Sequence, residues 1–199
     1  SRYTALTNTT TIRSVYNVTD TTCSELKYVR SAKYIDMGHN DTLTDLSFIG
    51  YMPDLEILIL SGCAASDLSG FENCKKLEYL ELANCLKLSD LTPLSGCASL
   101  KYLNICYTKV SSLMPLDGLP IQNLFCKRTR VGADEQTQFK QIHPDATAVF
   151  TGKDPYAGPG WRYVDNGYTY SGFYKKVREV FNLDQVDALL RAQEKAAGN

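Results

Sequence analysis

The sequence predicts an α/β solenoid in which short parallel strands line the concave side and short helical turns line the convex side. Three observations support this prediction: an apolar pattern recurs at a nearly constant period, its first half alternates, and its second half advances by steps of three. A recurring unit of about 20 to 50 residues indicates a repeat architecture, because one unit cannot bury its apolar edge alone. The units are therefore expected to stack.

The period is visible in five copies of one pattern. Each copy has apolar residues at its first, fourth and sixth positions and a polar residue or a cysteine at its ninth. The copies begin 23, 22, 23 and 21 residues apart, at Ala32, Leu55, Leu77, Leu100 and Ile121. Because the ninth position keeps its place, the differences in length fall in the second half of the unit.

The first half of each unit has the pattern of a strand with one buried face. In the third copy, Leu80 and Leu82 alternate with Tyr79 and Glu81. Alternation with a period of two places one set of side chains in the core and the other set on the opposite face. Each unit is therefore expected to add one strand to a parallel sheet.

The second half has the pattern of a tight helical turn. Apolar residues recur at every third position, as in Leu88, Leu91 and Leu94. Residue types that cap free backbone N–H groups at a helical start come just before the turns, at Asp45, Asp67, Asp90 and Ser112. These turns are expected on the convex side.

These units resemble leucine-rich repeats, and their length and D-L-x-x-L second half are similar to the internalin-like class of bacterial surface proteins. The resemblance covers about residues 32–131. It implies a leucine-rich repeat solenoid, a horseshoe or arc, that is capped at both ends. It also implies an exported or cell-surface setting in a bacterium, although free cysteines fit the cytoplasm equally well.

Three segments are expected. Residues 1–31 form an N-terminal cap with a degenerate first repeat, and residues 32–151 form the repeats with a closing helix and strand. Residues 152–199 form an aromatic and helical C-terminal cap, with Trp161 and Tyr163 among its rings. The alternative for this last segment is a carbohydrate or cell-wall binding module, because it is similar to one copy of the choline- or glucan-binding repeats.

Composition excludes several classes of protein. Apolar residues make up 44% of the chain, and 21 basic residues against 22 acidic ones leave a net charge of -1. This composition argues against disorder, and the near-zero charge argues against a nucleic-acid partner. No apolar stretch reaches the roughly 18 residues of a membrane span. Whether a signal peptide or an anchor has been removed stays open.

The seven cysteines are an odd set without a C-x-x-C pair, which fits neither a complete disulfide framework nor a zinc ribbon. The repeat places five of them at ninth or apolar positions, namely Cys63, Cys74, Cys85, Cys97 and Cys126. Only Cys106, expected on the concave face, and Cys23, outside the repeats, have no such place. Neither His39 nor His143 is expected beside Cys106, so the sequence predicts no enzyme, no cofactor and no metal.

The candidate binding residues are the outward strand positions. They form rows of aromatic, aliphatic and charged side chains across the expected sheet, comprising Tyr34, Asp36, Ile57, Ile59, Tyr79, Glu81, Tyr102, Asn104, Phe125 and Lys127. An apolar surface with charged borders is typical of a protein or peptide interface. The alternative is that these rings serve cross-strand packing or lie under a terminal segment. Charge changes along the rows, from acidic early to basic late.

Overall fold

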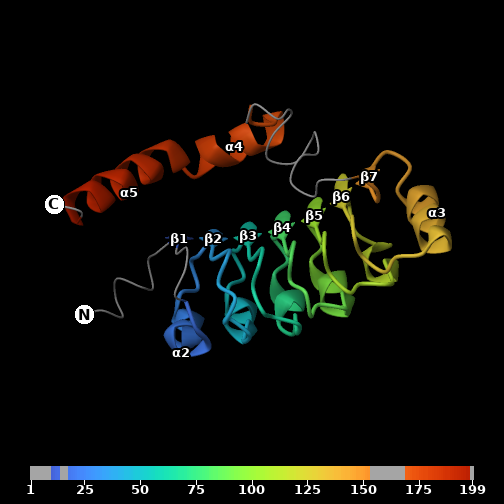
Figure 1. Ribbon diagram of the computed structural model, residues 1–199, viewed down its shortest axis with the longest axis horizontal. Helices are drawn as coiled ribbons and strands as arrows, with labels where there is room; N and C mark the ends of the chain where they lie inside the picture. The colour runs from blue at the N-terminus through green and yellow to red at the C-terminus, as the bar shows by residue number, and fades with distance from the viewer. Residues whose placement is uncertain (1–9, 14–17, 153–168, 198–199) are drawn as a thin grey trace. The chain divides into compact units, whose positions relative to one another are not determined.

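The computed structural model describes residues 10–13, 18–152 and 169–197. The chain divides into two compact units, Ser1–Lys153 and Asp154–Asn199. In the first unit the strands follow one another along one side and the short helical turns lie along the other (Figure 1). The predicted solenoid is therefore confirmed.

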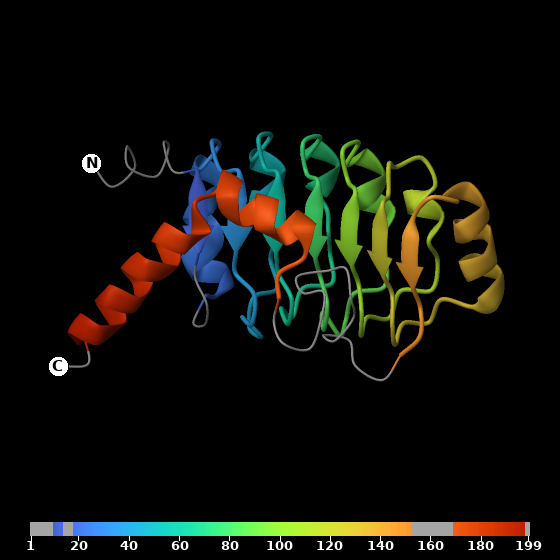
Figure 2. The same cartoon turned by 90° about the horizontal axis from the view of Figure 1, so that it is seen from above.

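The concave side is one sheet of seven parallel strands, ordered as they occur in the chain. These strands are β1 (Thr11–Arg13), β2 (Tyr34–Asp36), β3 (Ile57–Ile59), β4 (Tyr79–Glu81), β5 (Tyr102–Asn104), β6 (Asn123–Phe125) and β7 (Thr147–Val149). Their register follows the sequence period, since Tyr34 pairs with Ile57, Ile57 with Tyr79 and Tyr79 with Tyr102. Figure 2 shows these strands side by side.

The convex side consists of 3₁₀ turns and one short helix. They are α2 (Asp20–Cys23), η1 (Ser24–Tyr28), η2 (Ser47–Tyr51), η3 (Phe71–Asn73), η4 (Thr92–Gly96) and η5 (Met114–Leu116). A 3₁₀ helix has three residues per turn, which matches the apolar steps of three in the sequence. The expected helical turns are thus present.

Aspartate caps these turns from one position earlier than a standard N-cap. The Oδ1 atom of Asp45 accepts from the Ser47 N–H at 2.9 Å, and that of Asp90 accepts from the Thr92 N–H at 2.8 Å. Both donors are the first residue of their turn, and the N-cap position itself is Leu46 in η2. The predicted capping role of the aspartates is therefore confirmed. The leucine that lies between each aspartate and its turn is buried in the core.

The core lies between the sheet and the turns. Leu58, Leu80 and Leu103 sit at the centres of β3, β4 and β5 and are fully buried. Each strand buries one such residue against the apolar residues of the turns on either side, so the core runs continuously from repeat to repeat. Burial of this kind stabilises the stack rather than any single unit.

The ninth position of the repeat forms a hydrogen-bonded ladder. Asn40 Nδ2 donates to the Met37 carbonyl at 2.7 Å, within its own unit. The Cys63 thiol donates to that same carbonyl at 3.4 Å, and the Cys85 thiol donates to the Leu60 carbonyl at 3.4 Å. The two cysteines therefore link neighbouring units, and Asn40 also does so, because its Oδ1 atom accepts from the Val18 N–H at 2.8 Å.

The residue just before the ladder position has a left-handed backbone in every repeat. These residues are His39, Gly62, Asn84, Tyr107 and Arg128, with φ between 57° and 79°. Only glycine and, to a lesser degree, asparagine adopt this conformation without strain. The backbone turn is thus set by the stacking of the units and not by residue type.

Helix α3 (Ala133–Ile142) and β7 follow the last repeat of the first unit. Phe139 is buried, and its ring meets that of Phe150 edge-on at 6.3 Å. Ile142, the last residue of the helix, is 39% exposed. One aromatic residue therefore provides most of the contact between α3 and the core.

The second unit contains helices α4 (Gly172–Val180) and α5 (Leu183–Ala197). Ser171 caps α4 by accepting from the Tyr174 N–H at 3.1 Å. Arg178 of α4 binds Asp184 and Asp187 of α5, and this pairing ties the two helices together. Among the described residues, no helix is both long and apolar enough to cross a membrane.

Candidate functional site

Five strands bring nine of the ten predicted binding residues into two rows, and Lys127 follows the last of these strands. The first row passes from Tyr34 to Asn123, and the second from Asp36 to Phe125, each with one residue from every strand from β2 to β6. Neighbouring strands lie about 4.8 Å apart, so adjacent side chains in a row are in contact distance. The pairings that the sequence predicts for these rows are all confirmed.

These side chains lie on the concave face, but they are not an open surface. Tyr34, Ile57, Ile59, Tyr79 and Phe125 are buried although they do not belong to the core cluster. Among the candidate residues only Tyr102 is partly exposed. The role of these residues in binding stays a prediction.

The middle of the concave face holds a compact polar cluster. Glu81, which is only 4% exposed, accepts hydrogen bonds from the Tyr79 hydroxyl and, at 3.3 Å, from Ser61. The Tyr79 and Tyr102 rings lie 6.4 Å apart, and the Tyr102 hydroxyl donates to Gln122 at 2.8 Å. A buried carboxylate with hydroxyl donors is favourable because its hydrogen bonds replace those of water.

The charge of the concave face changes along the solenoid. Asp36 of β2 lies 3.8 Å from the guanidinium of Arg13 in β1 and also accepts from the Gly38 N–H. Lys127, just beyond β6, is buried at the opposite end, near Gly152. The face therefore passes from carboxylates on β2 and β4 to an ammonium group after β6.

The cysteines offer no nucleophile. All seven are free and buried. Burial raises the pKa of the Cys106 thiol to about 11 and that of Cys23 to about 12, and the pKa values of the other five rise to between about 11 and 12 for the same reason. A nucleophilic thiol needs a lowered pKa and access to substrate. The two cysteines that the sequence left unassigned thus behave like the structural ones.

The described part of the chain contains no group of three or more histidine, cysteine, aspartate or glutamate side chains arranged to hold a metal ion. His143 ends α3 as its C-cap residue, with its ring 4.6 Å from that of Phe139. The His143 side chain therefore packs against the closing helix and does not lie on the concave face.

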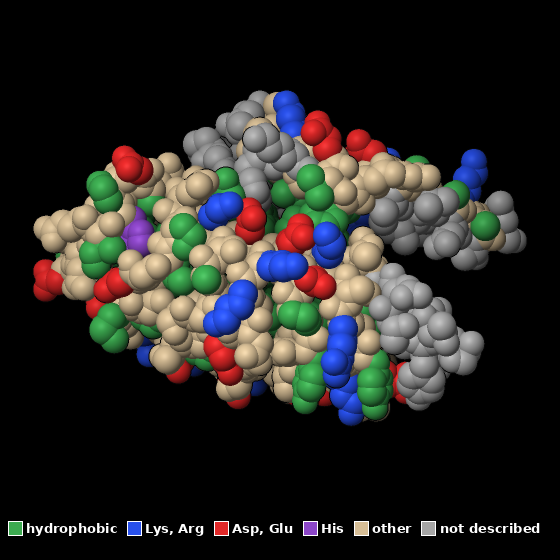
Figure 3. Space-filling view, turned by 180° about the vertical axis from the view of Figure 1, so that it is seen from behind, with side chains coloured by type: hydrophobic (Ala, Val, Ile, Leu, Met, Phe, Trp, Pro, Cys, Tyr) green, Lys and Arg blue, Asp and Glu red, His purple; other side chains and the backbone are tan. Residues whose placement is uncertain are grey.

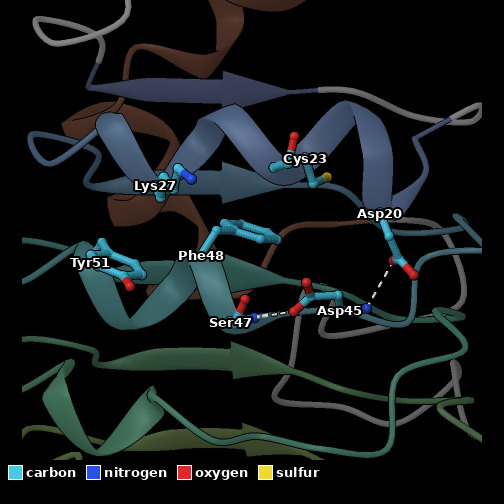
Figure 4. A pocket seen from close by; sticks show the side chains of 8 residues that line it. Asp20, Cys23, Lys27, Asp45, Ser47, Phe48 and Tyr51 are labelled. Atoms are coloured by element: carbon cyan, nitrogen blue, oxygen red, sulfur yellow. Dashed lines mark hydrogen bonds between the residues drawn. The ribbon is translucent and has the colours of Figure 1, made fainter.

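A pocket of about 220 Å³ lies on the convex side, between α2 with η1 and the following turn η2. Figure 4 shows Asp20 and Asp45 at one end, Lys27 and Tyr51 at the other, and Phe48 between them. Three N–H or O–H groups of residues 44 and 45 bind the Asp20 carboxylate, and these hydrogen bonds lower its pKa. The Asp20 carboxylate therefore holds the start of the following turn in place, and its presence in the pocket is explained by this structural role.

Sequence reasoning missed this pocket. The lining residue Tyr51, an exposed aromatic residue at the end of η2, is the signal in the sequence that could have indicated it. Elsewhere, the face drawn in Figure 3 mixes acidic and basic side chains with scattered apolar ones. Such a mixture is normal for a soluble surface and marks no further site.

The aromatic segment around Trp161 and Tyr163 lies outside the described residues. The carbohydrate-binding alternative, which depends on those rings, is therefore neither supported nor opposed by any contact in the structure.

The parallel register, the 3₁₀ turns and the ladder together define a leucine-rich repeat solenoid. A family model described as the leucine-rich repeat domain of the endo-beta-N-acetylglucosaminidase EndoS matches residues 54–142. No protein with curated annotation matches the chain.

Solved structures share the fold at low sequence identity. Internalin InlF of Listeria monocytogenes is 23% identical, with a TM-score of 0.66 over 76% of this chain and 46% of its own. A leucine-rich repeat protein of Leptospira interrogans is 24% identical, with a TM-score of 0.58 over 63% and 33%. Internalin C2 of L. monocytogenes is 19% identical, with a TM-score of 0.54 over 78% and 79%.

The chain spans less than half the length of the first two of these proteins. What they share with it is the form of the solenoid. The chain therefore has the leucine-rich repeat fold that it shares with these internalins.

Proposed function

We propose that the chain is a non-enzymatic binding module that recognises a protein or a peptide on its concave face. The observation that carries this proposal is the pair of rows on β2 to β6, where apolar rings and aliphatic side chains lie outside the core and beside charged groups. Central apolar contacts with charged neighbours are what a specific interface uses. The likeness to internalins supports the same class of function.

This proposal includes the statement that the chain has no catalytic role. It is supported by the raised pKa of every thiol, including that of Cys106, because a nucleophilic thiol needs a lowered pKa. A further part, supported only by the resemblance to internalins, is an exported or cell-surface location in a bacterium. Protection of the chain from a protease added to intact cells of its source would contradict this location.

The exposure of each concave side chain determines which substitutions can test the proposal. Replacing Tyr79 removes a fully buried ring, so lost binding could not be separated from lost folding. Tyr102 lies in the same row and is partly exposed, and Glu81 can be replaced by the isosteric glutamine. Tyr51, on the convex side and 51% exposed, is a matched control for the loss of a tyrosine ring.

The experiment selects phage-displayed random peptides on the wild-type chain and measures each peptide against the variants. We expect Tyr102→Ala and Glu81→Gln to weaken peptide binding by about tenfold, the effect of about 1.4 kcal/mol. Tyr51→Ala should leave binding unchanged, and all three variants should keep the circular dichroism spectrum of the wild type. Peptides whose affinity survives both concave substitutions would refute this proposal.

A further inference from the structure

Four exposed cations lie together where the strands β4, β5 and β6 lead into the convex turns. Lys87 follows β4, Lys109 follows β5, and Arg128 and Arg130 follow β6. We call these four residues the basic edge. The sequence groups Lys127 with the last three, but the structure buries Lys127 on the concave face and brings Lys87 to the group instead.

Hydrogen bonds between units hold the basic edge together. The Lys109 N–H donates to the Leu88 carbonyl at 2.7 Å, which places Lys109 beside the residue that follows Lys87. The Arg130 N–H donates in turn to the Val110 carbonyl at 2.8 Å, one residue after Lys109. Three consecutive units thus each place a cation at the same level of the stack.

The cations of the basic edge have no ion-pair partner in the described chain, unlike other cations of the solenoid. Lys33, Lys76 and Lys101 pair across neighbouring units with Glu56, Asp54 and Glu78, at 3.2, 2.6 and 3.0 Å. The next acidic residue after Arg130 is Asp134, which also forms no described ion pair with these cations. These three lysines are thus compensated by carboxylates of neighbouring units, whereas the cations of the basic edge are not.

This arrangement concentrates positive potential. Successive units are about 4.8 Å apart, so neighbouring cations lie well within the Debye length of about 10 Å at moderate salt. Like charges at such spacing repel one another, and an anionic partner relieves that repulsion while it gains attraction from several cations at once. The effect is local, because the whole chain carries a net charge of only -1.

We propose that the basic edge docks an acidic segment of a protein partner, one rich in aspartate or glutamate. A short acidic peptide fits a patch that spans three units, whereas a nucleic acid would extend past it over a chain without excess positive charge. The site is separate from the concave rows and does not depend on them. It assigns the chain a second binding surface of defined charge.

The test measures the binding of a fluorescein-labelled ten-residue glutamate peptide by fluorescence anisotropy, at low salt and at about three times that salt. The test variant is Lys109→Gln/Arg128→Gln/Arg130→Gln. The control variant, Lys33→Gln/Lys76→Gln/Lys101→Gln, removes the same number of charges from cations that already have carboxylate partners. Thermal melts of both variants establish that they are folded.

We expect saturable binding to the wild type that weakens with salt, a loss of about tenfold in the test variant, and a much smaller loss in the control. Equal losses in the two variants would overturn the proposal, because they would show a response to net charge alone. A single-stranded oligonucleotide of equal charge that binds more tightly than the peptide would overturn the assignment to an acidic protein segment. The concave variants Tyr102→Ala and Glu81→Gln should bind the peptide normally, so failure of one proposal leaves the other intact.

Discussion

The carboxylate of Glu135 accepts a hydrogen bond of 2.7 Å from the backbone N–H of Leu113, one repeat earlier in the chain. Asp20 has the mirror-image role at the other end, where it accepts from the N–H groups of Thr44 and Asp45 in the repeat that follows it. Each end of the solenoid thus supplies an acidic side chain that binds the turn of its neighbour. In addition, each of these turns and the repeats between them use an Asp or Ser of their own.

Replacing Glu135 by alanine is expected to lower the free energy of unfolding by about 1 to 2 kcal/mol, because the Leu113 N–H loses its acceptor. Asp134→Ala is the matched control, since it removes a carboxylate from the same first turn of α3 without a hydrogen bond to η5. Urea unfolding followed by circular dichroism measures both. Similar losses in the two variants would mean that Glu135 acts only through the helix dipole.

Asp20 is expected to make the stability of the amino-terminal end depend on pH. Its hydrogen bonds to residues 44 and 45 hold its pKa below the usual value near 4. A carboxylate with a lowered pKa in the folded state stabilises the fold above the unfolded pKa, and this contribution is lost as pH falls through the folded pKa. The destabilisation by Asp20→Ala should therefore be largest at neutral pH and shrink toward about pH 2.

The measurement for Asp20 is the urea midpoint of wild type and variant across this pH range. Asp41→Ala is the control, because Asp41 is an exposed carboxylate in the same region of the chain. A constant difference between wild type and Asp20→Ala at all pH values would contradict the proposed role of the ionised carboxylate.

Gly96 and Gly118 occupy equivalent positions at the ends of successive turns, yet they should respond differently to alanine. A Cβ atom on Gly96 would lie 2.5 Å from Cα of Glu72 and 2.6 Å from its carbonyl oxygen, whereas nothing lies within 4 Å of one on Gly118. We expect Gly96→Ala to cost about 1 to 3 kcal/mol of stability through overpacking. Gly118→Ala should be neutral or slightly stabilising, and thermal melting of the pair tests the contrast.

The ladder thiols should be replaceable by a hydroxyl but not by a methyl group. Cys85→Thr keeps a side-chain donor at the ladder position, where Thr108 of the next repeat donates to the Ile105 carbonyl of its own unit. Cys85→Val has nearly the same shape but no donor. The Leu60 carbonyl then keeps the Cys63 N–H at 3.1 Å and loses the side-chain donor, so Cys85→Val should be less stable than Cys85→Thr by about 1 kcal/mol. Equal unfolding midpoints for the two variants would show that the thiol acts only by filling space.

The repeat pattern was enough to predict the sheet and its rows. Residues that recur every 21 to 23 positions must stack in register, which is why the predicted pairing of Tyr79 with Tyr102 is confirmed. The same logic correctly assigned Cys63 and Cys85 to the ladder. The period could not predict burial of the concave rings, because burial depends on every group near them in space and not on spacing within one unit.

The sequence by itself determined the class of fold, the turns and the residues that share each row, since all of these follow from local periodicity. The tertiary structure decided which atoms of different repeats meet: a thiol with the carbonyl of the preceding unit, Glu135 with Leu113, and Lys109 with Leu88. Contacts of this kind join residues about twenty positions apart. The geometry of these contacts depends on how the units stack, so the sequence period alone does not predict it.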